Sequence, residues 1–212
     1  MPGIFITGTD TGCGKTYITA LLAEYFIEQG IDVGIFKPIA CGPRRENDAI
    51  HLKKRLKIKD PLDLINPIRL KLPLSPFSAS IILKKKINFE KIFRSYQKLC
   101  ERHQLVLVEG VGGALVPLTK NYYVADLIKD LGIPAIVVAR AGLGTINHTL
   151  LTCEALKSRK VEVLGIIMNG FKKREISEKS NAEIINKLTK LPIMAKIKFQ
   201  PSPSGRGREL NR

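Results

Sequence analysis

Residues 8–16 read Gly-Thr-Asp-Thr-Gly-Cys-Gly-Lys-Thr, the G-x-x-x-x-G-K-[ST] pattern of a phosphate-binding loop. Its glycines let the backbone turn tightly and point successive N–H groups at a polyphosphate. Lys15 can reach the β- and γ-phosphates, and the Thr16 hydroxyl can bind Mg²⁺. A short apolar run at residues 3–7 precedes the loop, and a helical stretch from Tyr17 to Gln29 follows it. Strand, loop and helix in this order predict a nucleoside triphosphate site at a helix N-terminus.

Four further apolar runs follow along the chain, at residues 33–36, 105–108, 135–138 and 163–167. Continuous runs rich in β-branched residues are typical of parallel strands that are buried on both faces. Amphipathic stretches, such as residues 145–159 and 175–189, predict helices between and after them, and residues 84–103 predict a charged helix. The alternation predicts an α/β fold in which helices cover both faces of a parallel sheet. Ligands bind such sheets at the carboxyl ends of the strands.

The length of 212 residues suits one domain, which we place at residues 1–200. Residues 201–212 are low in complexity, and we expect this tail to be disordered. The four cysteines have no paired spacing, which argues against a zinc ribbon or a disulfide framework and favours the reducing cytoplasm. The first apolar run leads into the phosphate loop and none reaches membrane-spanning length, so we expect a soluble protein with no signal segment.

The formal net charge of +16 comes from 35 Lys and Arg against 19 Asp and Glu. Such a balance can indicate a nucleic-acid partner. The basic residues are dispersed, however, in clusters such as residues 53–55, 84–86 and 172–174. We therefore interpret them as solvated faces and expect no nucleic-acid partner.

Three charged residues follow predicted strands along the chain. Lys37 follows the second run and could neutralise a transferring phosphoryl group, or it could be a surface lysine. Asp48 opens the next helix, as a cap or as a metal ligand. Glu109 ends a buried run where an enzyme with this loop needs a carboxylate for Mg²⁺. The glycine-rich turn after it would let backbone N–H groups approach phosphate, with a purely structural turn as the alternative.

Two further motifs follow later strands. Residues 142–148 open a helix whose N–H groups suit a substrate carboxylate, or which is capped by Thr145 or Asn147. His148 is expected to be an ordinary residue of the first helical turn. Asn169 ends the last run and could recognise the edge of a nucleotide base, or it could be a turn residue.

In combination, five motifs resemble the dethiobiotin synthetase family, the ATP-dependent ligases of biotin biosynthesis, over residues 3 to about 199; they are residues 8–16, Lys37-Pro38, residues 109–113, residues 143–152 and Asn169. The resemblance implies a three-layer P-loop NTPase fold with about seven, mostly parallel strands, and a homodimer. It implies that 7,8-diaminopelargonic acid forms a carbamate with CO₂, that the carbamate attacks the γ-phosphate of ATP, and that the second amine closes the ureido ring.

The resemblance also implies a role for each matching residue. Lys15, Lys37 and Thr11 would be catalytic, and Thr16, Asp48 and Glu109 would bind Mg²⁺. The substrate would contact Cys41, with Gly144, Thr145 and Asn147 holding its carboxylate across the dimer interface. ATP would contact the metal ligands and Gly12, Cys13, Gly14, Lys15, Tyr17, Gly110, Val111, Gly112, Asn169, Gly170, Lys198, Phe199 and Gln200.

The chain departs from the family pattern at several positions. Cys41 stands where serine is common, which predicts a weaker hydrogen bond to substrate. Phe77 stands where histidine is frequent, and Lys198 replaces a proline in the segment that closes on adenine. The tail after residue 200 has no counterpart in the family.

Two other classes of protein share the loop and sheet. Partitioning-type ATPase switches that bind DNA or a protein partner carry an extra lysine where this chain has Asp10, which argues against that class. Amidotransferase-type ligases need a separate glutamine-hydrolysing domain, for which 212 residues leave no room.

Overall fold

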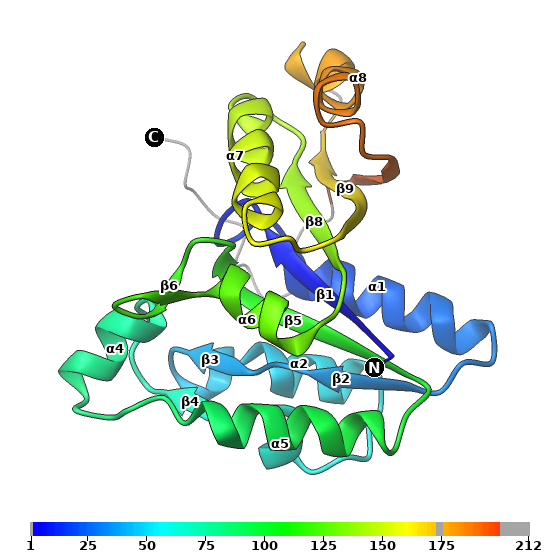
Figure 1. The fold of residues 1–212 in the computed structure, drawn as a ribbon. Helices are drawn as coiled ribbons and strands as arrows, with labels where there is room; N and C mark the ends of the chain where they lie inside the picture. Colours follow the sequence, from blue (N-terminus) through cyan, green and yellow to red (C-terminus); the bar gives the residue numbers. More distant parts are fainter. Residues whose placement is uncertain (1, 173–175, 200–212) are drawn as a thin grey trace.

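A parallel sheet forms the centre of the fold in the computed structural model, which describes residues 2–172 and 176–199 (Figure 1). Within this part of the chain the sheet has six strands in the order β10-β9-β8-β1-β5-β2. These are β1 (Gly3–Gly8), β2 (Val33–Phe36), β5 (Leu105–Gly113), β8 (Ala135–Arg140), β9 (Val163–Phe171) and β10 (Ile193–Lys198), and every neighbouring pair is parallel. The predicted α/β fold is confirmed, with one strand fewer than the expected number of about seven.

The main sheet ends at β2 because the chain breaks away at Lys37 and Pro38. The Lys37 N–H donates to the Ile65 carbonyl at 2.8 Å, and Pro38 has no N–H to donate. The next segment, β3 (Ile39–Cys41), therefore pairs with β4 (Ile68–Leu70) in a separate two-stranded sheet. A hairpin of β6 (Pro117–Thr119) and β7 (Tyr122–Tyr123) follows β5.

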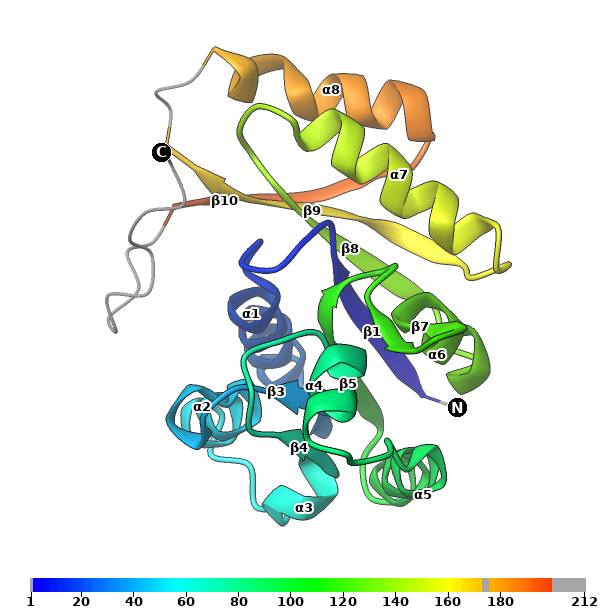
Figure 2. The ribbon, with the colours of Figure 1, turned by 90° about the vertical axis from the view of Figure 1, so that its left-hand side faces the viewer.

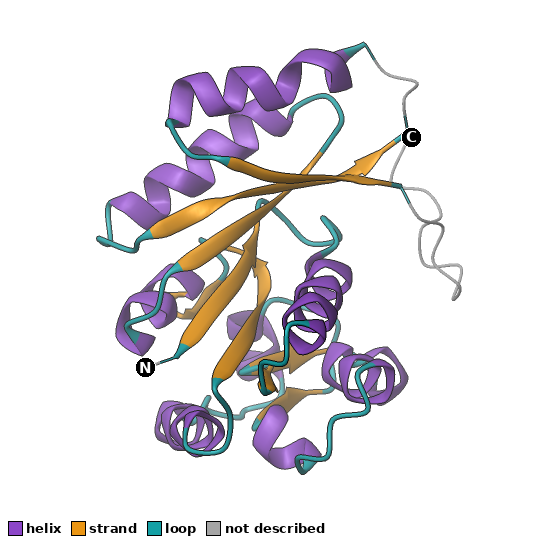
Figure 3. Ribbon diagram, turned by 90° about the vertical axis from the view of Figure 1, so that its right-hand side faces the viewer, coloured by secondary structure: helices purple, strands orange, loops and turns teal. Residues whose placement is uncertain are grey.

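Helices cover both faces of the sheet (Figure 3). One face carries α5 (Phe89–Cys100), α6 (Val124–Leu131), α7 (Thr145–Lys157) and α8 (Ser177–Thr189), and the other carries α1 (Lys15–Glu28), α2 (Asp48–Arg55) and α3 (Leu62–Ile65). Alternate strand residues serve the two cores: Phe5 packs with the α5–α8 layer and Ile6 with α1. The three-layer arrangement expected from the resemblance is thus present.

Several helix bounds differ from the predicted ones. The stretch predicted at 84–103 is helical only over α5, because the Asn88 side chain accepts the Lys91 N–H and starts the helix there. The described residues also form the short helix α4 (Pro76–Ile82) and a 3₁₀ turn at Arg44–Glu46. In the described ranges no helix is long and apolar enough to cross a membrane. The predicted tail at 201–212 and the ATP contact Gln200 lie outside the described residues.

The parallel arrangement brings the strand ends together at one edge of the sheet. The loop after β1, the Lys37 segment after β2, the end of β5 and the segments after β8 and β9 all lie there (Figure 2). These are the five places where the sequence put its polar motifs.

Candidate nucleotide and metal site

The phosphate loop joins β1 to α1 in the predicted order of strand, loop and helix. Gly12 and Gly14 have φ values of +72° and +99°, which lie in the left-handed region that favours glycine. A Cβ atom on Gly14 would lie 2.0 Å from Asn169 Nδ2, so a side chain there would also collide with β9. The Lys15 side chain is 7% exposed, and its Nζ donates to the Asp10 carbonyl at 2.9 Å. The ammonium is therefore held inside the loop, where a polyphosphate would lie.

Lys37 is a buried residue at the centre of a charged cluster. Its Nζ lies 2.7 Å from Glu109 Oε1, 2.8 Å from Asp48 Oδ2 and 3.0 Å from the Gly110 carbonyl, and the residue is 2% exposed. Thr16 of the phosphate loop donates its hydroxyl to Glu109 Oε1 at 2.7 Å. The surface-lysine interpretation is wrong, and Lys37 lies with Glu109, Asp48 and the phosphate loop at the edge where the strands end.

Asp48 does not cap its helix. Asn47 does so instead, because its side chain accepts the Ala49 N–H at 2.9 Å. Of the two interpretations of Asp48, the helix cap is therefore wrong, and its carboxylate is directed at Lys37.

The charges in this cluster depend on one another. Burial acts to lower the pKa of Lys37, but Glu109 and Asp48 together raise it above its usual value. Burial also raises the pKa of Glu109, against the attraction of Lys37. For Asp48, burial is outweighed by Lys37, and the pKa falls below its usual value. Lys37 is thus a permanent cation that keeps its two carboxylate partners close together.

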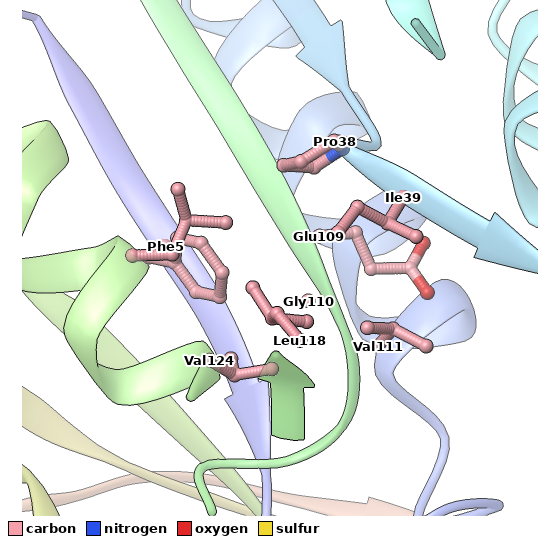
Figure 4. A pocket seen from close by; sticks show the side chains of 9 residues that line it. Phe5, Pro38, Ile39, Glu109, Gly110, Val111, Leu118 and Val124 are labelled. Atoms are coloured by element: carbon pink, nitrogen blue, oxygen red, sulfur yellow. The ribbon is translucent and has the colours of Figure 1, made fainter. Parts of the chain in front are cut away.

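An apolar hollow borders Glu109, whose carboxylate points away from Phe5, Leu118 and Val124 (Figure 4). Its lining consists of Phe5, Pro38, Ile39, Glu109, Gly110, Val111, Leu118, Val124 and Leu127.

The oxygen atoms of the cluster fit a magnesium ion. Glu109 is only 1% exposed, and its Oε2 atom is buried without a hydrogen-bond partner among the described residues. An orphaned buried carboxylate oxygen is costly unless a ligand satisfies it. Together with the Thr16 hydroxyl and Asp48, it supplies the hard oxygen donors that Mg²⁺ prefers. Among the described residues, no group of three or more His, Cys, Asp or Glu is arranged to hold a metal.

The segment after β8 leads into the predicted carboxylate motif. Gly144 has a φ of +87° and precedes α7. Among the described residues no side chain caps this helix, so capping by Thr145 or Asn147 is wrong. Thr145 Oγ1 lies 3.5 Å from Thr149 Oγ1 instead. His148 is an exposed residue in the first turn, as expected. This helix end lacks a side-chain acceptor and suits an anion.

Asn169 lies inside β9, so its interpretation as a turn residue is wrong. Its Nδ2 donates to the Cys13 carbonyl of the phosphate loop at 3.0 Å. Beyond it, Gly170 has a φ of +91°, and the Lys172 Nζ lies 5.0 Å from the centre of the Phe199 ring. Lys198 is exposed at the end of β10. Recognition of the base by these residues stays a prediction.

Other predicted residues lie around the cluster. Thr11 is exposed at the tip of the loop, with its N–H 2.6 Å from Asp10 Oδ1. The Tyr17 ring lies under the Arg55 guanidinium, at 5.5 Å. Cys41 is half-buried on β3, where burial raises the pKa of its thiol to about 11. The Gly144 turn follows β8, whereas Lys37 and Cys41 follow β2. Because β1 and β5 lie between β8 and β2 in the sheet, these residues do not follow neighbouring strands within one protomer.

Sequence reasoning missed two side chains that hold this edge together. Arg140 Nη2 donates to the Thr11 carbonyl at 2.9 Å and lies 3.6 Å from Asp10 Oδ2. Asn181 of α8 donates to the backbone of the segment after β8. Both act on main-chain carbonyls, which leave no residue pattern in a sequence.

Comparison with known proteins identifies the family. The sequence matches the AAA domain family over residues 2–205. It is 43% identical to the ATP-dependent dethiobiotin synthetase BioD of Thermodesulfovibrio yellowstonii, over 93% of this chain and 88% of that protein. Identity to the BioD of Endomicrobium trichonymphae is 45%, over 91% and 90% of the two chains, and to that of Methanocaldococcus jannaschii 48%, over 78% of each. The chain belongs to the dethiobiotin synthetase family.

Solved structures of other proteins share the fold of this family member. The MinD cell division protein of Aquifex aeolicus superposes with a TM-score of 0.62 at 18% identity, covering 98% of this chain and 87% of that one. A ParA family ATPase from Chlorobium tepidum gives 0.58 at 12% identity, covering 97% and 87%. At these identities the likeness establishes the P-loop fold alone.

Proposed function

We propose that this chain catalyses the ATP-dependent carboxylation and ring closure of 7,8-diaminopelargonic acid to dethiobiotin. The observation that carries the proposal is the buried Lys37, which lies 2.7 Å from Glu109 and 2.8 Å from Asp48 beside the phosphate loop. A second fixed cation next to Lys15 suits a reaction that transfers a phosphoryl group to an anionic acceptor.

The reaction would proceed in three steps. One amine of the substrate adds to CO₂ and loses a proton, which gives a carbamate. A carbamate oxygen then attacks the γ-phosphorus of ATP, the bond to the bridging oxygen breaks, and ADP leaves. Finally the second amine attacks the carbonyl carbon of this carbamic-phosphoric anhydride, the bond to the phosphate oxygen breaks, and phosphate leaves as the ureido ring closes.

The side chains would act mainly by positioning and by neutralising charge. Lys15 and Lys37 would stabilise the negative charge that moves between carbamate and γ-phosphate, and Thr11 would lie beside the transferring group. The raised pKa of Lys37 keeps it protonated throughout. Asn169, Gly170, Lys198 and Phe199 would surround the base.

Thr16, Asp48 and Glu109 would hold Mg²⁺. The orphaned Glu109 Oε2 supports this assignment. When bound, the ion would neutralise phosphate charge and orient the β- and γ-phosphates. Lys37 offsets one of the two negative charges and holds both carboxylates within 2.8 Å of its ammonium, so the ligands are already close together before the ion enters.

The substrate would lie between Cys41 of one copy and the Gly144–Asn147 turn of the other copy in a homodimer. Gly144, Thr145 and Asn147 of that turn would bind the substrate carboxylate. Two exposed apolar side chains near that turn support an interface there: Leu143 is 90% exposed and Leu151 is 55% exposed. Mixing two inactive variants, Lys37→Met and Gly144→Val, would then restore about a quarter of wild-type activity through hybrid dimers with one intact site. No recovery on mixing would place each site within a single copy.

The partitioning-type ATPase switch is the less favoured alternative. Asp10 occupies the place of its signature lysine and is paired with Arg140 at 3.6 Å. The resemblance to MinD and ParA structures is one of fold. A cytoplasmic location accords with the ATP requirement and with the four unpaired cysteines.

The decisive assay measures ADP release with the diamine acid, bicarbonate and DNA added separately and together. The proposal predicts release only when the diamine acid and bicarbonate are both present. Turnover that needs neither, and that rises with DNA, would establish the switch instead.

A further inference from the structure

We propose that Asn181 of α8 is a positioning residue that fixes the turn reading the substrate carboxylate. The proposal rests on the proposed function, which gives the Gly144–Asn147 turn its role. Asn181 belongs to none of the sequence motifs, and α8 lies beside α7 on the same face of the sheet (Figures 2 and 3).

The Asn181 amide holds two consecutive carbonyls. Its Nδ2 donates to the Ala141 oxygen at 2.8 Å and to the Gly142 oxygen at 3.2 Å, and the residue is 4% exposed. Both donor positions of a buried NH₂ group are thus used on one short stretch of backbone. Loss of the amide would leave two desolvated carbonyls without this donor, and the stretch would shift to recover a partner.

The direction of these carbonyls sets the direction of the N–H groups that follow. The described peptide bonds are trans, so a carbonyl that points at α8 sends the next N–H away from it. The Gly142 and Leu143 N–H groups therefore point away from the Asn181 amide. Within the turn, the Thr145 N–H reaches the Gly142 oxygen at 3.4 Å, and among the described residues no side chain caps α7.

The same stretch is also tied to the phosphate loop. The Ala141 N–H donates to the Asn169 carbonyl at 2.9 Å, and the Asn169 side chain donates to the Cys13 carbonyl at 3.0 Å. A continuous series of hydrogen bonds thus runs from Asn181 through Ala141 and Asn169 to the nucleotide site. Asn181 therefore ties the carboxylate turn to the edge of the sheet that carries the phosphate loop of its own copy.

The test compares Asn181→Ala and the milder Asn181→Ser, which keeps one donor, with wild type. Misplacing a binding group by about 1 Å can cost 10²-fold, so we expect the KM for the diamine acid to rise roughly 10- to 100-fold in Asn181→Ala and less in Asn181→Ser. The ADP dissociation constant, measured by calorimetry, should change less than about twofold because the phosphate loop itself is intact.

A second readout separates positioning from a general structural role. The carboxamide analogue of the substrate lacks the charge that the turn would read. The ratio of kcat/KM for the acid to that for the carboxamide should fall about tenfold or more in Asn181→Ala. Asn186→Ala is the matched control, because that amide lies on the same helix and donates to the Leu191 carbonyl at 2.8 Å, away from the site.

An unchanged acid-to-carboxamide ratio in both Asn181 variants would overturn the positioning role, even if both substrates reacted more slowly. The same holds if Asn186→Ala lowers the ratio as much as Asn181→Ala does. Failure of the proposed function has a different signature: wild type itself would then release no ADP in response to the diamine acid and bicarbonate.

Discussion

Replacing Lys37 with methionine removes the one charge that holds the two carboxylates together, while keeping most of the buried volume. Lys37 is 2% exposed and lies within 2.8 Å of a carboxylate oxygen of each partner. Breaking a buried ion pair costs about 3–5 kcal/mol. The Asp48 side chain is 40% exposed, so solvent screens part of the repulsion and we take the lower end. A loss of about 3 kcal/mol corresponds to a fall in Tm of roughly 6–12 °C for a chain of this size.

The effect on turnover is expected to be larger than the effect on stability. Removal of one preorganised donor to a developing charge costs about 10²–10³ in kcat, or about 2.7–4 kcal/mol. Mg²⁺ with ADP should recover part of the lost Tm, because the ion would replace the missing positive charge between Glu109 and Asp48. The kcat should not recover, because the ion cannot take the position of the ammonium group.

The assay is coupled ADP release at saturating substrates, together with thermal unfolding with and without Mg²⁺ and ADP. Lys53→Met is the matched control, since Lys53 lies in the last turn of α2, at the other end from Asp48, and its ammonium donates to the Ile58 and Asp60 carbonyls at 2.6 Å each. We expect the control to lose stability and keep its kcat. A folded Lys37→Met protein that turns over within about threefold of wild type would refute the assigned role.

Three further perturbations test separate parts of the account. Gly14→Ala places a Cβ 2.0 Å from Asn169 Nδ2 at a φ of +99° and should weaken ADP binding about tenfold or more by calorimetry, whereas Gly30→Ala, at a φ of +79° with open space around it, should not. Burial raises the pKa of Cys41 to about 11, so its alkylation by iodoacetamide should be slow at neutral pH and accelerate with rising pH; rapid labelling at neutral pH, seen by mass spectrometry, would contradict this. Burial acts to raise the pKa of Asp60, but hydrogen bonds from Arg102 and His103 hold it below its usual value, so the group stabilises the fold above its unfolded pKa and loses that contribution as the pH falls. The stability advantage of wild type over Asp60→Asn should be roughly 1.5–3 kcal/mol at neutral pH, begin to shrink as the pH falls through about 4, and disappear below the lowered pKa of the folded state; a constant difference across that range would be evidence against it.

The sequence was sufficient for the features that depend on local pattern. The phosphate loop is contiguous, and its glycines have the positive φ values that its function needs at Gly12 and Gly14. The meeting of Lys37 with Glu109 could also be predicted, although 72 residues separate them, because both follow strands of a parallel sheet. The uncertainty about Lys37 and Asp48 came from burial, which their immediate neighbours do not reveal.

Other features depend on contacts that no local pattern encodes. The main sheet has fewer strands than predicted because the Lys37 N–H donates to the carbonyl of Ile65 in α3. This hydrogen bond to a residue distant in sequence directs the chain away from the main sheet. Asn181 and Arg140 act on backbone carbonyls, which every residue type presents alike. Their importance follows only from where the chain places those carbonyls.

The central claim is that the cluster of Lys15, Lys37, Glu109 and Asp48 joins CO₂ to a diamine at the expense of ATP. The most direct measurement supplies carbon-13-labelled bicarbonate with ATP, Mg²⁺ and the diamine acid, and follows ADP and product together by mass spectrometry. We expect labelled dethiobiotin and ADP in equal amounts, with the label in the ureido carbon. ADP release without a labelled ring product would contradict the account.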